Sequence, residues 1–165
     1  IRQCKIIANL PYNIGTTLLF KWLKTPALFE SFTLMLQKEV VDRIIAVPST
    51  KNYGRVSVMA QLLCKASKKF DVPPEAFIPP PKVMSSVVQL TPYKQPLYDI
   101  EPEIVEKFCK LAFSQRRKML RGSLKKSCPD IDTILKDLDI NPQARAEELD
   151  IKTLCKLSEK IYKTI

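Results

Sequence analysis

Apolar positions follow two different patterns along the chain. In residues 1–93 short apolar runs alternate with segments of helical spacing, which is typical of a mixed α/β domain. The runs predict strands over residues 5–8, 32–36, 68–72 and 86–90, and helices over residues 15–23, 38–46 and 56–64. We expect residues 94–100 to be a linker. Four amphipathic stripes after it predict a small all-helical domain over residues 101–165.

The first predicted strand ends at a polar and aromatic tetrapeptide, Asn9-Leu10-Pro11-Tyr12. Functional groups of open α/β sheets lie at the carboxyl ends of the strands. Pro11 fixes its own φ and favours an extended Leu10, so the carbonyls around it are held rigidly. The Asn9 amide oxygen and the carbonyl of Leu10 or Pro11 can accept hydrogen bonds from an exocyclic amine, and Tyr12 offers a flat face. The tetrapeptide therefore predicts a pocket for an extruded adenine.

The other side of this pocket needs a second aromatic ring. Phe77 is the candidate, because it precedes the stiff run Pro79-Pro80-Pro81, which can hold the ring in place. Base–aromatic stacking contributes on the order of 1–3 kcal/mol, which offsets the cost of taking a base out of its stack. For the helix that follows the tetrapeptide, Asn13 and Thr16 are the expected caps.

Several segments together resemble one enzyme family. The tetrapeptide is similar to motif IV of amino-methyltransferases that use S-adenosylmethionine. Three further segments match in order and spacing a bacterial-type family, the ribosomal RNA small-subunit adenine dimethyltransferases: Leu36-Gln37-Lys38-Glu39-Val40-Val41-Asp42-Arg43, Tyr53-Gly54-Arg55-Val56-Ser57-Val58 and Phe77-Ile78-Pro79-Pro80-Pro81-Lys82-Val83-Met84-Ser85.

This resemblance implies a fold, a reaction and several residue roles. Residues 1–93 would be the C-terminal portion of a Rossmann-like catalytic domain, and residues 101–165 an RNA-binding domain. The reaction would be N6,N6-dimethylation of adenines in small-subunit ribosomal RNA within an assembling small subunit. Asn9, Leu10, Pro11, Tyr12 and Phe77 would form the catalytic site, with Tyr12 and Phe77 stacking on the base. Asn9 would also touch the cofactor, S-adenosylmethionine.

The few glycines affect the cofactor prediction. The chain has three glycines, Gly15, Gly54 and Gly122, and no two of them are close. A nucleotide-type cofactor in an α/β sheet normally needs a glycine-rich turn after the first strand. The family carries such a turn, and an acidic residue for the ribose, upstream of the tetrapeptide. We therefore expect this polypeptide to be a fragment without the main cofactor-binding segment, and to be inactive alone.

The net charge of +10 favours a polyanionic partner. Residues 115–126 contain six cations and no acid. On one helix Arg117, Arg121 and Lys125 would form a stripe suited to a phosphate backbone. We expect RNA contacts from this segment and, by resemblance, from Tyr53, Arg55 and Lys82. The full set of predicted RNA-binding residues is Tyr53, Arg55, Lys82, Arg116, Arg117, Lys118, Arg121 and Lys125.

Other charged residues have more ordinary interpretations. Lys38 and Arg43 lie near Glu39 and Asp42 on one predicted helix. For these two cations, pairing on the surface and contact with RNA remain about equally favoured. In the segment 145–149 we expect a cap or a salt bridge between helices.

Composition excludes several kinds of chemistry. The chain has no histidine, and its five cysteines have no metal-ligand spacing. A metal site, a disulfide framework and histidine base catalysis are therefore not expected. No apolar run approaches the ~20 residues that span a bilayer, and no signal peptide is recognised. We expect a cytoplasmic protein with reduced thiols.

Two alternative functions remain at this stage. The first is the sibling family that methylates adenine in large-subunit ribosomal RNA. The second is a non-catalytic RNA- or DNA-binding protein on the same fold, such as a ribosome-assembly or transcription factor. The intact tetrapeptide favours retained chemistry, and the Phe77–Val83 segment favours the small-subunit enzyme.

Overall fold

The computed structural model describes residues 3–115 and 118–163. The chain forms two compact units. The first unit comprises Ile1–Ile45 and Leu63–Leu97, and the second comprises Ala46–Leu62 and Tyr98–Ile165. Residues 46–62 thus cluster with the C-terminal part of the chain rather than with the sheet. The assignment of catalysis to residues 1–93 and of RNA binding to residues 101–165 concerns function and stays a prediction.

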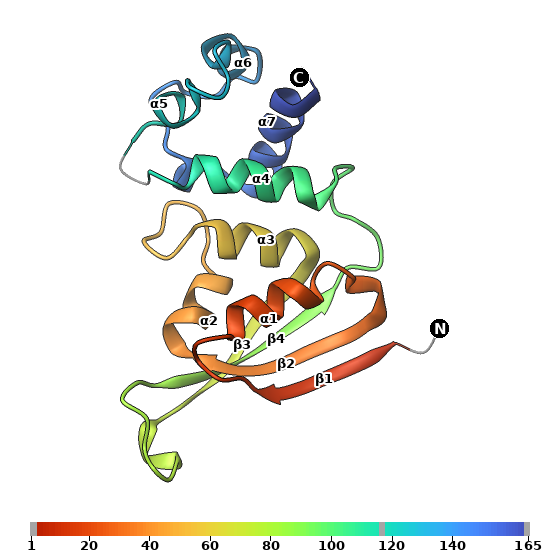
Figure 1. Cartoon of the computed structure of the whole chain (residues 1–165), viewed down its shortest axis with the longest axis vertical. Coiled ribbons are helices and arrows are strands. Elements are labelled where there is room, and N and C mark those ends of the chain that lie inside the picture. Colours follow the sequence, from red (N-terminus) through yellow and green to blue (C-terminus); the bar gives the residue numbers. More distant parts are fainter. Residues whose placement is uncertain (1–2, 116–117, 164–165) are drawn as a thin grey trace. The chain divides into compact units, whose positions relative to one another are not determined.

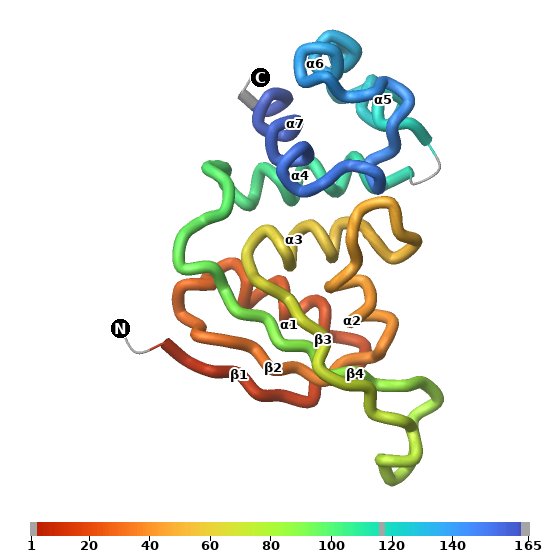
Figure 2. The backbone as a smooth tube through the Cα atoms, turned by 180° about the vertical axis from the view of Figure 1, so that it is seen from behind, coloured from red at the N-terminus to blue at the C-terminus, as the bar shows by residue number. Residues whose placement is uncertain are grey.

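The first unit is built on a four-stranded mixed sheet. Its strands are β1 (Cys4–Asn9), β2 (Phe29–Gln37), β3 (Cys64–Val72) and β4 (Ser85–Pro92), and they lie in the order β1-β2-β4-β3. β1 and β2 are parallel, whereas β4 is antiparallel to both of its neighbours. The backbone in Figure 2 follows this order. The predicted strands are confirmed, and β3 begins earlier than expected, directly after a helix.

Two helices lie against one face of this sheet, as Figure 1 shows. Helix α1 (Gly15–Trp22) connects the parallel strands β1 and β2, and α2 (Lys38–Ile44) follows β2 without a break. The short 3-10 helices η1 (Pro26–Leu28) and η2 (Pro74–Ala76) complete the connections. Alternate side chains of β2 are buried on the helix side of the sheet, because successive strand residues point to opposite faces: Phe32, Leu34 and Leu36.

Helix α1 packs closely against the sheet at its first residue. A Cβ atom at Gly15 would collide with Cδ2 of Leu36 and would lie 3.6 Å from Cβ of Leu10. The expected caps Asn13 and Thr16 are wrong. The N-cap is Ile14 and has no side-chain hydrogen bond. Instead, the Pro11 carbonyl accepts the N–H groups of Ile14 and Gly15, at 3.2 and 3.1 Å, so a backbone turn begins the helix.

In the part that the structure describes, the secondary structure of the second unit is helical. They are α3 (Arg55–Leu63), α4 (Pro102–Ala112), α5 (Leu120–Leu124), α6 (Ile131–Asp137), the 3-10 helix η3 (Ala146–Glu148) and α7 (Ile151–Lys163). α7 packs against α4 and α6. The largest fully buried side chains of this core include Tyr53, Phe108, Leu120, Leu124, Ile131 and Leu135. Within the described residues, none of the helices has the length and apolar character needed to span a membrane.

Candidate functional site

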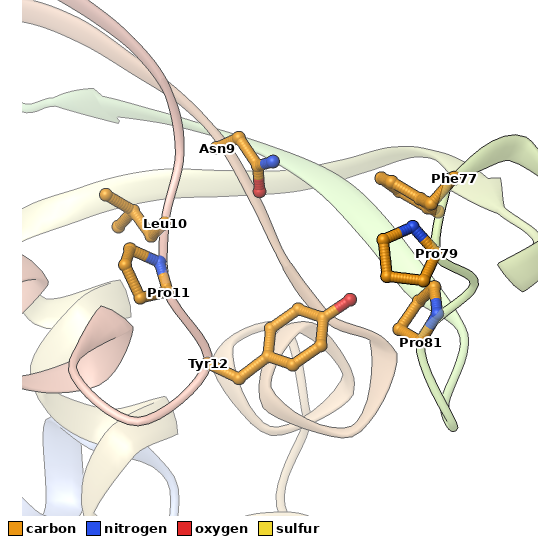
Figure 3. A pocket seen from close by; sticks show the side chains of 7 residues that line it. All are labelled: Asn9, Leu10, Pro11, Tyr12, Phe77, Pro79 and Pro81. Carbon is orange, nitrogen blue, oxygen red and sulfur yellow. The ribbon is translucent and has the colours of Figure 1, made fainter.

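A pocket of about 300 Å³ opens in the first unit at the carboxyl end of β1. Its volume lies at the lower end of the range for small-ligand sites, which begins at about 300 Å³. Two segments form it: the tetrapeptide after β1 and the proline-rich segment between η2 and β4 (Figure 3). All five predicted catalytic residues line this pocket, together with two prolines: Asn9, Leu10, Pro11, Tyr12, Phe77, Pro79 and Pro81.

Asn9 is the last residue of β1 and is exposed. In Figure 3 its amide points into the space between the rings of Tyr12 and Phe77. Leu10 is buried, and its N–H donates to the carbonyl of Met35 in β2 at 3.1 Å. The backbone therefore stays tied to the sheet for one residue beyond the strand, which fixes the backbone of Asn9 and Leu10 relative to the sheet.

The two carbonyls proposed from the sequence differ in their availability. A backbone carbonyl has two lone pairs. The Pro11 carbonyl already accepts two N–H groups, those of Ile14 and Gly15. Of the two, the Leu10 carbonyl is therefore the better acceptor for an exocyclic amine in the pocket.

Tyr12 is half-buried and is held by its hydroxyl. The hydroxyl oxygen lies 2.7 Å from Oγ of Ser85, a distance at which either group can be the donor. Ser85 is the fully buried first residue of β4. Sequence reasoning gave Ser85 no role, although it ends one of the segments that carry the resemblance.

The opposite wall of the pocket is an extended segment in which alternate residues face the pocket. Phe77 ends η2 with φ −121° and ψ 150°, and its N–H donates to the carbonyl of Pro74 at 3.1 Å. Phe77, Pro79 and Pro81 line the pocket, and Ile78 and Pro80 between them do not. Ile78 is fully exposed. Lys82 is also exposed and does not line the pocket, so it is available on the surface beside it.

An ionic network connects α2, β3 and β4 in the same unit. Lys68 lies 2.7 Å from a carboxylate oxygen of Asp71, and Ser86 donates to that carboxylate at 2.5 Å. The hydrogen bond from Lys68, followed by that from Ser86, lowers the pKa of Asp71. Lys38 pairs with Asp42, and this hydrogen bond raises the pKa of Lys38.

On α2 the pairing role of the charged residues is confirmed. Lys38 pairs with Asp42, and Arg43 pairs with Glu39, both at the i,i+4 spacing of a helix. In the second unit, the carboxylate of Glu148 accepts the N–H of Arg145 at 3.3 Å, which confirms the expected cap.

The structure corrects the RNA-binding role of Tyr53. Its side chain is fully buried in the second unit, with its ring 6.2 Å edge-to-face from that of Phe113. A ring buried in this way cannot stack on a base. Arg55 is the first residue of α3 and is partly exposed.

The basic segment 115–126 is not one continuous helix. Arg116 and Arg117 lie outside the described residues. Helix α5 begins only at Leu120, whose N–H donates to the carbonyl of Ala144 at 2.8 Å, so Lys118 precedes the helix. Lys118 and Arg121 are exposed, whereas Lys125 lies 2.8 Å from a carboxylate oxygen of Asp132. The predicted stripe is therefore reduced to the pair Arg121 and Lys125, of which Lys125 already has an acidic partner.

Buried cysteines do not offer reactive thiolates. Burial raises the pKa of the Cys64 thiol to about 12 and that of Cys155 to about 11. These thiols stay protonated near neutral pH, so they are poor nucleophiles and poor metal ligands. Among residues 3–115 and 118–163 no cluster of three metal-ligating side chains is found.

Comparisons with known proteins agree on one family. A family model described as "Ribosomal RNA adenine dimethylase" matches residues 1–163. Ribosomal RNA small subunit methyltransferase A of Cereibacter sphaeroides is 46% identical over 159 residues, which cover 95% of this chain and 57% of the relative. The protein of the same name from Rhodospirillum rubrum is 48% identical over 157 residues, covering 95% of this chain and 54% of the relative. The chain thus spans little more than half the length of these curated relatives.

Solved structures give the same result at the level of the fold. A dimethyladenosine transferase from Plasmodium falciparum superposes with a TM-score of 0.87 at 26% identity, covering 99% of this chain and 68% of that protein. The 23S rRNA methyltransferase ErmE superposes with a TM-score of 0.69 at 22% identity, covering 98% of this chain and 66% of that protein. The second likeness shows the fold alone.

Proposed function

Because this chain belongs to the ribosomal RNA adenine dimethylase family, we propose that the full-length protein carrying it dimethylates the N6 amine of adenines in small-subunit ribosomal RNA. One observation carries the proposal. Asn9, Leu10, Tyr12 and Phe77, identified from two distant segments of the sequence, line a single pocket. The names of the curated relatives favour the small subunit as the substrate.

The pocket has what amine methylation requires of a protein. The lone pair of an adenine amine is delocalised into the ring, which makes the amine a poor nucleophile. The Asn9 amide oxygen and the Leu10 carbonyl would accept its two hydrogens and draw the nitrogen toward a tetrahedral shape, with the lone pair aimed at the methyl group. The rings of Tyr12 and Phe77 would hold the base between them. Catalysis of this kind rests on positioning and on preorganised acceptors and needs no strong base.

S-adenosylmethionine, when bound, supplies an electrophilic methyl group on a sulfonium. Asn9 fits a contact with it, because its exposed amide stands at the edge of the pocket and offers both a donor and an acceptor. The chain has no glycine-rich turn: Gly15 lies in α1, packed against Leu36, and the other two glycines are distant in sequence. Asn9 is thus the one cofactor contact that we assign to these residues.

For contact with the RNA partner, the best candidates in the described chain are the exposed Lys82 and the exposed pair Lys118 and Arg121. Lys82 directly follows Pro81, the last residue that lines the pocket. Lys118 precedes α5, and Arg121 lies in the first turn of that helix. These cations would contact phosphates of the RNA and hold the target within reach. An assembling small ribosomal subunit is the proposed form of the substrate.

Methyl transfer to isolated ribosomal subunits tests the proposed function. The full-length protein is incubated with isotopically labelled S-adenosylmethionine and with small or large subunits from cells that lack the modification. We expect labelled N6,N6-dimethyladenosine in digests of small-subunit RNA. Asn9→Ala should lower its rate by about 100-fold or more, the scale of losing one preorganised group. Label confined to large-subunit RNA, or no label in either, would overturn the proposal.

A further inference from the structure

The hydroxyl of the pocket's tyrosine is anchored by a residue from the middle of the sheet. Ser85 Oγ lies 2.7 Å from the Tyr12 hydroxyl, although the two residues are 73 positions apart in sequence. Ser85 pairs with Gln37 of β2 on one side and with Val72 of β3 on the other. It is fully buried. Its hydroxyl is therefore fixed relative to the sheet on which the pocket is built.

Tyr12, by contrast, lies in the turn between β1 and α1. Two side-chain torsions set the direction of its ring. Backbone hydrogen bonds of the Pro11 carbonyl hold the turn but do not fix these torsions. The phenolic oxygen lies on the axis of the second torsion, so a hydrogen bond to it fixes the first torsion directly. It restrains the second torsion because the O–H bond and lone pairs of a phenol favour the plane of the ring. The contact with Ser85 therefore restrains the tilt of the Tyr12 ring. Figure 3 shows this ring at the border of the pocket.

We propose that Ser85 is a positioning residue that holds the stacking face of Tyr12 and thereby supports transfer of the second methyl group. This inference rests on the proposed function. An unmodified adenine amine has two hydrogens for two acceptors, Asn9 and the Leu10 carbonyl. Each transfer forms an N–C bond, breaks the methyl–sulfur bond of the sulfonium to leave a thioether, and releases one amine proton to solvent. After the first transfer the amine therefore has one hydrogen left, and the base has one hydrogen bond fewer. Its orientation then depends more on stacking, and a loosened Tyr12 slows the second transfer more than the first.

The hydrogen bond can be removed from either end. In the full-length protein we compare wild type with Ser85→Ala, Tyr12→Phe and the double variant, and measure monomethyl- and dimethyladenosine over time. Loss of the free energy of one hydrogen bond corresponds to a decrease in rate of about threefold to tenfold. We expect the second transfer to slow by this factor, and by more than the first, so that monomethyladenosine accumulates. The double variant should behave like either single variant, because both remove the same contact.

Ser86→Ala is the matched control. Ser86 is also fully buried in β4, but it donates to Asp71 instead of contacting Tyr12. Its loss should lower stability and leave the ratio of the two products unchanged. The inference is overturned if Ser85→Ala keeps the wild-type ratio, if the single effects multiply in the double variant, or if Ser86→Ala shifts the ratio equally.

A binding measurement separates this inference from the proposed function. Single-stranded RNA containing 2-aminopurine loses fluorescence when the base stacks on an aromatic ring. We expect the full-length protein to quench it, and Ser85→Ala and Tyr12→Phe to quench it less. If wild type forms no methylated adenine, the proposed function fails, and quenching alone then decides the role of Ser85. Equal quenching by wild type and Ser85→Ala, or none by wild type, would overturn that role.

Discussion

Neighbouring backbone groups of the tetrapeptide make hydrogen bonds to different elements. The Leu10 N–H is bonded to Met35 in β2, and the Pro11 carbonyl is bonded to the two N–H groups that begin α1. The strand and the helix therefore fix the loop from both sides, and neither of these bonds uses the Asn9 side chain or the Leu10 carbonyl. The helix can approach so closely only because residue 15 has no side chain.

Gly15→Ala should therefore destabilise the protein. The added methyl group would collide with the buried Leu36, and overpacking of this kind costs about 1–3 kcal/mol. Gly122→Ala is the matched control, because no atom lies within 4 Å of the methyl group it would add in α5. There the free energy of unfolding should rise by about 0.5–1 kcal/mol, since alanine is the better helix former. Urea unfolding of both variants measures the difference. Equal stability of the two would contradict the account.

The sequence predicted the pocket residues because their chemistry is local: a strand end, a proline and aromatic rings in two recognisable segments. It did not predict that Ser85 holds Tyr12, because that contact depends on how β4 is placed in the sheet. It also misjudged Tyr53. Its RNA contact was expected from the family resemblance, but tertiary packing buries the ring beside Phe113.

At the scale of elements, the helix and strand pattern of the sheet was predictable because apolar periodicity is strong there. The helix boundary in the basic segment was not predictable in this way. The cations suggested a stripe on one helix, although the apolar pattern allowed a break before Met119. The chain does leave helical geometry at Lys118 and Met119, where the Leu120 N–H bonds to Ala144. A distant backbone acceptor determines where α5 starts, and no local pattern encodes that acceptor.

The exposed cations at α5 should contribute to RNA binding through phosphates. Replacing both Lys118 and Arg121 by alanine should weaken binding of small-subunit RNA and make the slope of log affinity against log salt shallower by about 0.7–0.9 per lost phosphate contact. Salt titrations of the full-length protein measure this slope. Lys136→Ala, an exposed cation in the last turn of α6, serves as the control and should keep the wild-type slope. An unchanged slope in the double variant would exclude this segment from the RNA interface.

The Asp71 network predicts a pH dependence of stability. Its partners Lys68 and Ser86 lower the pKa of Asp71 in the folded state, so the folded carboxyl binds its proton less readily than the unfolded one. The contribution of the Asp71 carboxylate to stability is complete above the pKa of about 3.9 that it has in the unfolded state. This contribution is lost as the pH falls through the lower pKa of the folded state. Asp71→Asn should therefore be less stable than wild type at pH 7, with a gap that narrows in acid below about pH 4. Urea unfolding at several pH values measures this difference in the free energy of unfolding.

The control for this prediction is Asp99→Asn, which removes an exposed carboxylate outside the network. Its stability should follow that of wild type at every pH. A constant gap between wild type and Asp71→Asn from neutral to acidic pH would show that the carboxylate charge is not what Lys68 and Ser86 stabilise.

The chain as a whole carries the pocket at the carboxyl end of β1, and β1 is one of the two edge strands of the sheet. It covers 57% of the length of the Cereibacter relative. We predict that these 165 residues bind RNA in a salt-sensitive manner but transfer no methyl group alone, because they contain no glycine-rich turn. Methyl transfer by the isolated chain, compared with the full-length protein on the same subunits, checks this. Robust transfer by the chain would contradict it.

The unpaired edge of β1 has a consequence for the isolated chain. Exposed strand edges pair with other chains, and Ile7 on this strand is 81% exposed. We expect the chain to self-associate with rising concentration and Ile7→Lys to reduce this, as sedimentation velocity would show. Val47→Lys replaces an exposed apolar residue that lies outside the strands and should have no such effect.

The central claim is that an adenine lies between Tyr12 and Phe77 while its amine is methylated. The most direct test is mass spectrometry of nucleosides from small subunits treated with full-length wild type, Tyr12→Ala, Phe77→Ala or Phe70→Ala. Phe70 is an exposed ring of the same unit that does not line the pocket. Loss of stacking should lower methylation about tenfold to 100-fold in the first two variants. Phe70→Ala should match wild type. Undiminished dimethyladenosine in Tyr12→Ala and Phe77→Ala would show that the base is bound elsewhere.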